Sequence, residues 1–223
     1  MANSMTNVPE ALSSLVERSI QLHETIHDHV ETLIPFGELR FEIAFDSGVL
    51  ALEHGTAALH LIEAGWTSSA FALMRPQFES LVRGIWLAHA ASDLWIEKLS
   101  QPLTITAQKQ ANEGPMVAEM LKQLEAAPGA PAGIVGQLKE YRDVSWKALN
   151  SFNHGGIHAL SKNVTGYSRK LIYDALRNSN AVMALTAQLV SIMTGDETNM
   201  VPVRRIHVDY ADCLPIVQVP SSH

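Results

Sequence analysis

The sequence predicts an all-α protein, an up-and-down bundle of about seven or eight helices with an extended C-terminal arm. Apolar residues recur at helical spacing through most of the chain. Short segments containing glycine or proline separate these stretches, and short links favour antiparallel neighbours in a bundle. Of the 223 residues, 47% are hydrophobic and 17% are charged, which is typical of a globular protein with a sizeable core.

Each predicted helix is bounded by residues typical of helix termini. Pro9 lies near the start of the first helix, and Thr67 and Ser68 can cap the third. Pro76 lies inside the third helix, where proline removes a backbone donor and favours a kink. Gly195 ends the last long helix. The predicted helices cover residues 9–34, 38–64, 67–91, a short segment from 93, two pieces within 102–123 separated at 114–115, then 134–152 and 168–193.

The C-terminal segment has a different composition. From Asp196 it contains three prolines and several β-branched residues, in the stretch VPVRRIHVDYADCLPIVQVP, without a helical period. The chain is therefore predicted to consist of a helical bundle domain, 1–195, and an extended arm, 196–223. Because the arm is apolar, we expect it to pack on its own domain or on a neighbouring subunit.

The net charge and the composition limit the kinds of partner and the compartment that we expect for this protein. The net charge is −7, from 16 basic and 23 acidic residues without a dense basic run, so broad binding to nucleic acid is not expected. The single cysteine, Cys213, fits a reducing compartment. Neither a signal peptide nor a membrane span is visible, and a soluble cytoplasmic protein is predicted. The modest charged fraction favours a homodimer.

The third helix carries the main candidate site. Arg75, Glu79 and Arg83 are spaced by four in an otherwise apolar helix, SAFALMRPQFESLVRGIWLAHA. Such a helix is buried on most sides, so the charged stripe is expected to face protein or a cleft rather than open water. Two interpretations stay open besides simple surface exposure. The group is either a clasp between helices or a pocket in which a guanidinium with spare donors binds an anion.

The second helix offers Glu53 and His54 beside this group. His54 falls in register with Leu50, Ala58 and other apolar positions, so it is predicted to point inward, with Glu53 at the edge of that face. His54 is then either a core histidine or a member of a polar cluster with Arg75 or Glu79, where a perturbed pKa would be expected.

A third candidate lies at the end of the helix predicted over 134–152. Tyr141 and Asn150 lie within this helix, and His154 follows it beside two glycines. A histidine in this position either stabilises the helix C-terminus or acts as an acid, base or anion ligand.

No cofactor or metal is predicted. A di-iron bundle needs two Glu-x-x-His pairs, and the sequence has one, at residues 24–27. It also lacks a HExxH motif, a phosphate-binding loop, a GxGxxG motif after a strand and a GxSxG elbow.

Two stretches resemble known families. Residues 52–93, with a histidine followed by SAFALMRPQFE and RGIWL, are similar to an uncharacterised bacterial all-helical family without an assigned activity. The segment NSFNHG, 150–155, resembles the HEPN superfamily, many of whose members are metal-independent ribonucleases or nucleotide-binding proteins. That resemblance implies roles for His154 and Asn150, with Lys147 where the superfamily has an arginine.

The sequence leaves two hypotheses for function. In the first, the chain is a helical, dimeric protein of uncharacterised activity whose polar cluster of Arg75, Glu79 and Arg83 is structural or binds a small anion. In that prediction Glu53, His54 and Tyr141 are further candidate ligand-binding residues, and His54 and His154 lie near the cluster. In the second, the chain is a divergent HEPN-like ribonuclease or nucleotide-binding protein, in which His154 is the acid or base.

Overall fold

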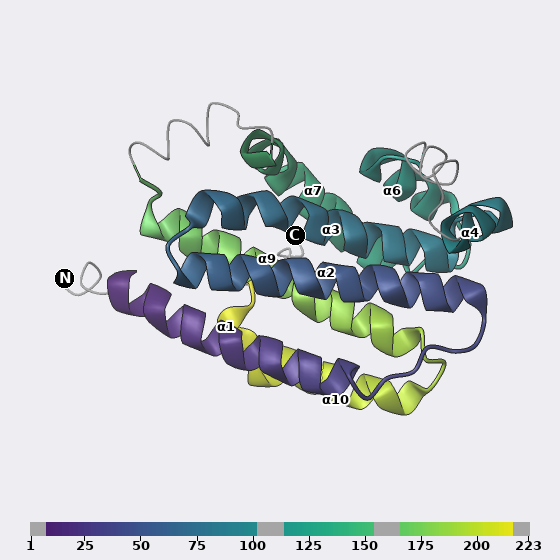
Figure 1. Ribbon diagram of the computed structural model, residues 1–223, viewed down its shortest axis with the longest axis horizontal. Helices are drawn as coiled ribbons and strands as arrows, with labels where there is room; N and C mark the ends of the chain where they lie inside the picture. Colours follow the sequence, from purple (N-terminus) through teal and green to yellow (C-terminus); the bar gives the residue numbers. More distant parts are fainter. Residues whose placement is uncertain (1–7, 102–113, 154–165, 216–223) are drawn as a thin grey trace, which may run out of the picture.

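The computed structural model describes residues 8–101, 114–153 and 166–215. These residues form helices and connecting turns without a strand, so the all-α prediction is confirmed (Figure 1). The α-helices are α1 (Val8–Val30), α2 (Leu39–Glu63), α3 (Thr67–His89), α4 (Asp93–Ser100), α6 (Val117–Ala126), α7 (Ala132–Asn153), α9 (Arg169–Ile192) and α10 (Met200–Asp209).

The long helices pack side by side around α2, α3 and α9 (Figure 1). α1 and α10 cover one side of this central group, and α6 and α7 pack on α3 on the opposite side. Every one of the three central helices contributes buried side chains, and the largest fully buried ones are Trp86, Phe71 and Phe78 of α3. The core therefore runs through the middle of the bundle, and polar groups on α3 lie near it.

Two glycines allow α2 and α3 to approach α9 closely. A Cβ atom at Gly48 of α2 would lie 2.5 Å from Val190 Cγ1. At Gly84 of α3, a Cβ atom would lie 2.6 Å from Leu189 Cδ2 and 3.1 Å from the Ala44 carbonyl oxygen. Larger residues would push the helices apart, because interiors are close-packed.

Arg40, near the start of α2, caps the C-terminus of α3. Its Nη1 donates to the carbonyl oxygens of Leu87 (2.6 Å) and Ala91 (2.8 Å), and its Nη2 pairs with Asp93 at 2.8 Å. The last carbonyls of a helix have no partner within the helix and carry partial negative charge. The guanidinium therefore ties the two central helices together at this end of the bundle.

The prediction of an extended C-terminal arm is wrong over the segment that follows α9. Residues Glu197–Asn199 and Ala211–Cys213 form 3-10 turns on either side of α10. Pro202 lies in the first turn of α10, where its missing N–H is tolerated. Val203 and Ile206 are buried, and α10 packs on α9 of its own chain. Tertiary packing therefore outweighs the weak helix propensity of the β-branched residues.

In the part of the chain that the structure describes, no helix combines the length and the apolarity that a bilayer crossing requires.

Candidate functional site

The charged stripe, Arg75, Glu79 and Arg83, lies on α3, the helix on which α6 and α7 pack. Arg75 Nε donates to Glu79 Oε1 at 2.8 Å, and their side chains are 20% and 30% exposed. The group is therefore neither enclosed in the core nor free in solvent. The outer part of each of these two side chains is therefore in contact with solvent.

Arg83 differs from Arg75 in its partners. The carboxylate of Glu79 is engaged by Arg75, and the half-buried Arg83 makes no hydrogen bond or ion pair in the described residues. A guanidinium has five N–H donors and stays protonated in proteins. Arg83 therefore brings to α3 a positive charge and N–H donors that no described residue uses.

Aromatic and amide groups surround this stripe. Tyr141 of α7 stacks on Phe78 at a centroid distance of 4.5 Å, and burial raises the pKa of the Tyr141 hydroxyl. The indole Nε1 of Trp86 donates to Gln123 Oε1 of α6 at 2.7 Å. Asn150 of α7 has a buried Oδ1 atom without a hydrogen-bond partner in the described part. The helix that carries the stripe, α3, therefore contacts α7 through an aromatic pair and α6 through a hydrogen bond.

The residues predicted on α2 lie elsewhere. His54 is half-buried at the edge of the helix, and Glu53 is exposed. Within the described ranges, neither makes a hydrogen bond or ion pair with Arg75 or Glu79. The inward face of α2 is formed by residues such as Ala51, Gly55 and Ala58, whereas Leu50 is exposed. The sequence register had included Leu50 in that face.

The third candidate site, at the end of α7 with His154, lies mostly outside the residues that the structure describes. His154 is outside the described residues, as is the side chain of Lys147, although the backbone of Lys147 belongs to α7. The HEPN-like site stays a prediction for this reason. Among the residues that the structure describes, no group of three or more His, Cys, Asp and Glu side chains could hold a metal ion.

A second polar group, centred on His23 of α1, was missed from the sequence. His23 is buried, and its Nε2 lies 3.2 Å from Asn180 Oδ1 of α9. Because an amide oxygen only accepts, Nε2 carries the hydrogen and Nδ1 is left to accept from Thr56 Oγ1 at 3.3 Å. Thr56 in turn accepts from His27 Nε2 at 2.9 Å. Burial is the main cause that lowers the pKa of His23 to about 4, so the ring is neutral near pH 7.

Asn180 connects these hydrogen bonds to the C-terminal segment. Its Nδ2 donates to Ser19 Oγ at 2.8 Å and to the Cys213 carbonyl oxygen at 3.2 Å. Ser19 in turn donates to the Leu15 carbonyl oxygen at 2.7 Å. We call Ser19, His23, Thr56 and Asn180 the buried polar seam. All its hydrogen-bonding groups have partners with consistent directions, which is what a stable buried network requires.

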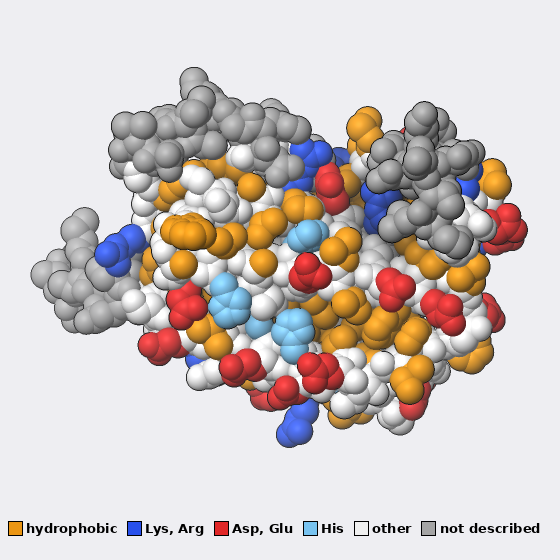
Figure 2. Space-filling model, in the orientation of Figure 1, with side chains coloured by type: hydrophobic (Ala, Val, Ile, Leu, Met, Phe, Trp, Pro, Cys, Tyr) orange, Lys and Arg blue, Asp and Glu red, His pale blue; other side chains and the backbone are white. Residues whose placement is uncertain are grey.

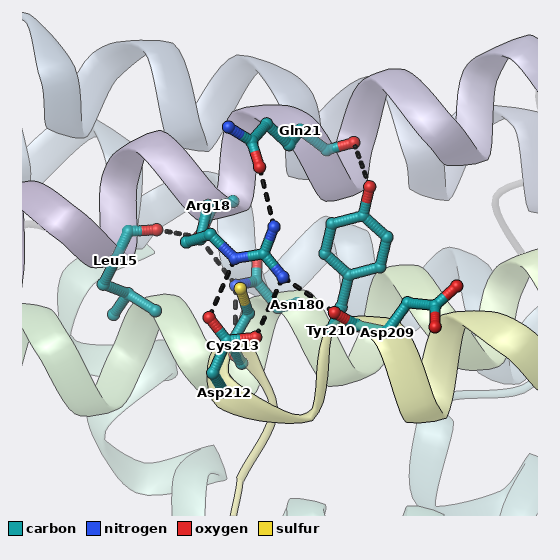
Figure 3. A network of polar contacts seen from close by, with 9 residues as sticks. Leu15, Arg18, Gln21, Asn180, Asp209, Tyr210, Asp212 and Cys213 are labelled. Atoms are coloured by element: carbon teal, nitrogen blue, oxygen red, sulfur yellow. Dashed lines mark hydrogen bonds and ion pairs between the residues drawn. The ribbon is translucent and has the colours of Figure 1, made fainter.

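Arg18, on α1 one residue before Ser19 of the seam, binds the C-terminal segment at the surface. Its guanidinium donates to Asp212 Oδ2 at 2.8 Å, to Gln21 Oε1 at 2.7 Å and to the Asp209 carbonyl oxygen at 2.7 Å (Figure 3). The ring of Tyr210 lies under the guanidinium, 4.7 Å from Cζ to the ring centroid. Arg18 thus holds the end of α10 on α1, and hydrogen bonding to Arg18 is the main cause that lowers the pKa of Asp212.

These features define a helical bundle with a paired polar seam and a charged stripe in which no described residue pairs with Arg83. Within that class, the chain belongs to DUF6988, a family of unknown function whose family model matches residues 48–216. The matched range includes the stripe on α3 together with α7, α9 and α10, whereas α1 precedes it. Comparison with curated proteins and with solved structures gives no match.

Proposed function

We propose that this protein binds a small anionic ligand at the charged stripe of α3, with Arg83 as the principal ligand-binding residue. The observation that carries the proposal is the half-buried guanidinium of Arg83, which has no hydrogen-bond or ion-pair partner among the described residues. An anion with two or three oxygen atoms, such as a phosphate or a carboxylate, supplies the acceptors that the planar guanidinium matches.

The ion pair between Arg75 and Glu79 sets the net charge of this site. Glu79 neutralises Arg75 through their 2.8 Å contact, which leaves a net charge near +1 on the three residues. A single positive charge in a partly screened position favours a small anion over an extended polyanion, and the chain as a whole is acidic with a net charge of −7. We propose in addition that the protein acts as a homodimer.

A thermal-shift screen tests ligand binding. The wild-type protein, R83A and the matched control R169A, which removes an exposed arginine at the start of α9, are heated with inorganic phosphate, ATP and succinate. We expect at least one of these anions to raise the Tm of the wild type and of R169A, without any effect on R83A. Equal shifts in all three proteins, or no shift in any of them, would contradict the proposal.

A further inference from the structure

The outer face of α2 is both apolar and acidic. At about 100° per residue, Leu39, Ile43 and Leu50 form one ridge of this face. Leu39 and Leu50 are each 43% exposed. The adjacent ridge carries three exposed carboxylates, Glu42, Asp46 and Glu53. Figure 2 shows apolar side chains gathered over one half of α2 and between α2 and α1, with acidic side chains around them.

The carboxylates of this face are available to a partner. None of Glu42, Asp46 and Glu53 makes an ion pair or a side-chain hydrogen bond in the described residues. Arg40, also on α2, is directed to the end of α3 and to Asp93 instead. A partner must therefore cover apolar side chains and bring positive charge at the same time.

α10 of the same chain has the complementary face. Val201, Arg204, Arg205 and Val208 are spaced so that they share one side of the helix, and all four are exposed. Val201 and Val208 are 53% and 77% exposed, and neither arginine has an ion-pair partner within the described ranges. Burial of Val203 and Ile206 holds α10 with this basic, apolar face outward.

We infer that α10 of one copy docks on the outer face of α2 of a second copy. Val201 and Val208 cover Leu50 and its ridge. Arg204 and Arg205 flank the two valines on opposite sides, so the arginine on the carboxylate side meets the carboxylate ridge. The other pairings are disfavoured because α2 against α2 opposes carboxylates and α10 against α10 opposes arginines. This inference rests on the proposed homodimer and is independent of anion binding at Arg83.

The size of α10 indicates a reciprocal contact. A helix of ten residues is about 15 Å long, so one contact alone covers less than the ~800 Å² per partner of a standard interface. Two such contacts related by a twofold axis double the area and close the assembly.

Charge reversal tests the pairing directly. Variant R204E/R205E makes α10 acidic, and variant D46K/E53K makes α2 basic. Each variant alone opposes like charges, so we expect a dimer dissociation constant at least about 100-fold weaker than that of the wild type. In an equimolar mixture of the two variants, every α10 again meets an α2 of opposite charge, and the dimer returns.

Analytical ultracentrifugation of all the proteins, with circular dichroism to confirm folding, gives the result. The control R169E/K170E reverses the other adjacent basic pair of the chain and is expected to stay dimeric. A monomeric wild type would overturn both the homodimer and this interface. A dimeric wild type whose R204E/R205E variant is also dimeric, or a mixture that stays monomeric, would overturn the interface alone. Phosphate binding measured on the same samples reports on Arg83 separately.

Discussion

Two arginines on different helices of the bundle show how similar side chains acquire different roles. Arg18, between α1 and the end of α10, donates to Asp212, to Gln21 and to a backbone carbonyl. Arg83, half-buried on α3, has no such partner in the described residues. A guanidinium whose donors are used by protein acceptors fixes the fold, whereas one with free donors has the capacity to bind a ligand.

The same contrast separates the buried polar seam from the charged stripe. In the seam, Asn180 uses its oxygen and both amide hydrogens. Buried polar groups are costly when they are left unpaired, so a complete network of this kind indicates a structural role. The stripe is half-exposed, which makes unused donors at Arg83 tolerable because water can satisfy them until a ligand binds.

Loss of Asn180 should cause the largest effect. N180A leaves the Nε2–H of His23 and the Cys213 carbonyl without a buried partner and also creates a cavity. We expect the free energy of unfolding to fall by about 4 kcal/mol. Urea denaturation monitored by circular dichroism measures this value. A loss below about 1 kcal/mol would show that the seam is not a structural network.

The pH dependence of stability should report on His23. In the unfolded chain its pKa is near 6.5, and burial lowers the pKa to about 4 in the fold. Between these values the unfolded state binds a proton that the folded state excludes, so stability decreases as the pH falls from about 6.5 to about 4. The decrease amounts to at most about 3 kcal/mol.

Variant H23Q serves as the reference for this pH effect. The glutamine amide keeps a donor and an acceptor but does not titrate. Subtracting its unfolding free energies from those of the wild type at each pH isolates the contribution of His23. Parallel curves for the two proteins between pH 6.5 and pH 4 would mean that the seam tolerates a protonated His23.

Loss of Arg18 should have a smaller effect than loss of Asn180. R18A removes the contact with Asp212 and uncaps the end of α10, but the two side chains are 33% and 57% exposed. We expect a destabilisation of about 1 kcal/mol, because solvent screens exposed ion pairs. Hydrogen exchange should show faster opening of residues 200–213 in this variant. Unchanged hydrogen exchange of residues 200–213 in R18A would show that burial of Val203 and Ile206 alone holds α10 on the bundle.

Loss of Arg83 should have the smallest effect on stability. Since Arg83 has no described partner, we expect the free energy of unfolding of R83A to stay within about 0.5 kcal/mol of the wild type. Urea denaturation without added anions checks this, with E79Q as a comparison that weakens a 2.8 Å pair. A destabilisation of R83A above about 1.5 kcal/mol would indicate that Arg83 is a structural clasp.

Much of the fold follows from sequence patterns, since long amphipathic helices carry a strong periodic signal. The second helix was predicted over 38–64 and is observed over Leu39–Glu63, and the last long helix was predicted over 168–193 and is observed over Arg169–Ile192. α10 was missed because its stretch of valines has weak helix propensity, and only burial of Val203 and Ile206 on α9 explains its formation.

The polar groups were harder to predict. The i,i+4 spacing of Arg75 and Glu79 indicated their ion pair, which lies on one helix. The seam joins His23 to Asn180, 157 residues later in the chain, and no local pattern links the two. The one available signal was that His23, unlike its neighbour Glu24, falls on the face of α1 that carries Ile26 and Leu15. That no described residue pairs with Arg83 likewise depends on three-dimensional packing, which a local sequence pattern does not show.

The side-chain Nε–H signals of the arginines in a ¹⁵N NMR spectrum test the availability of Arg83 most directly. The signal of Arg83 is assigned with R83K, that of Arg18 with R18K, and the protein is titrated with the anion that raises its Tm most. We predict that the Arg83 signal shifts in a saturable manner while the Arg18 signal stays in place. An Arg83 signal that does not move, or equal and unsaturable shifts of both signals, would contradict a ligand site on α3.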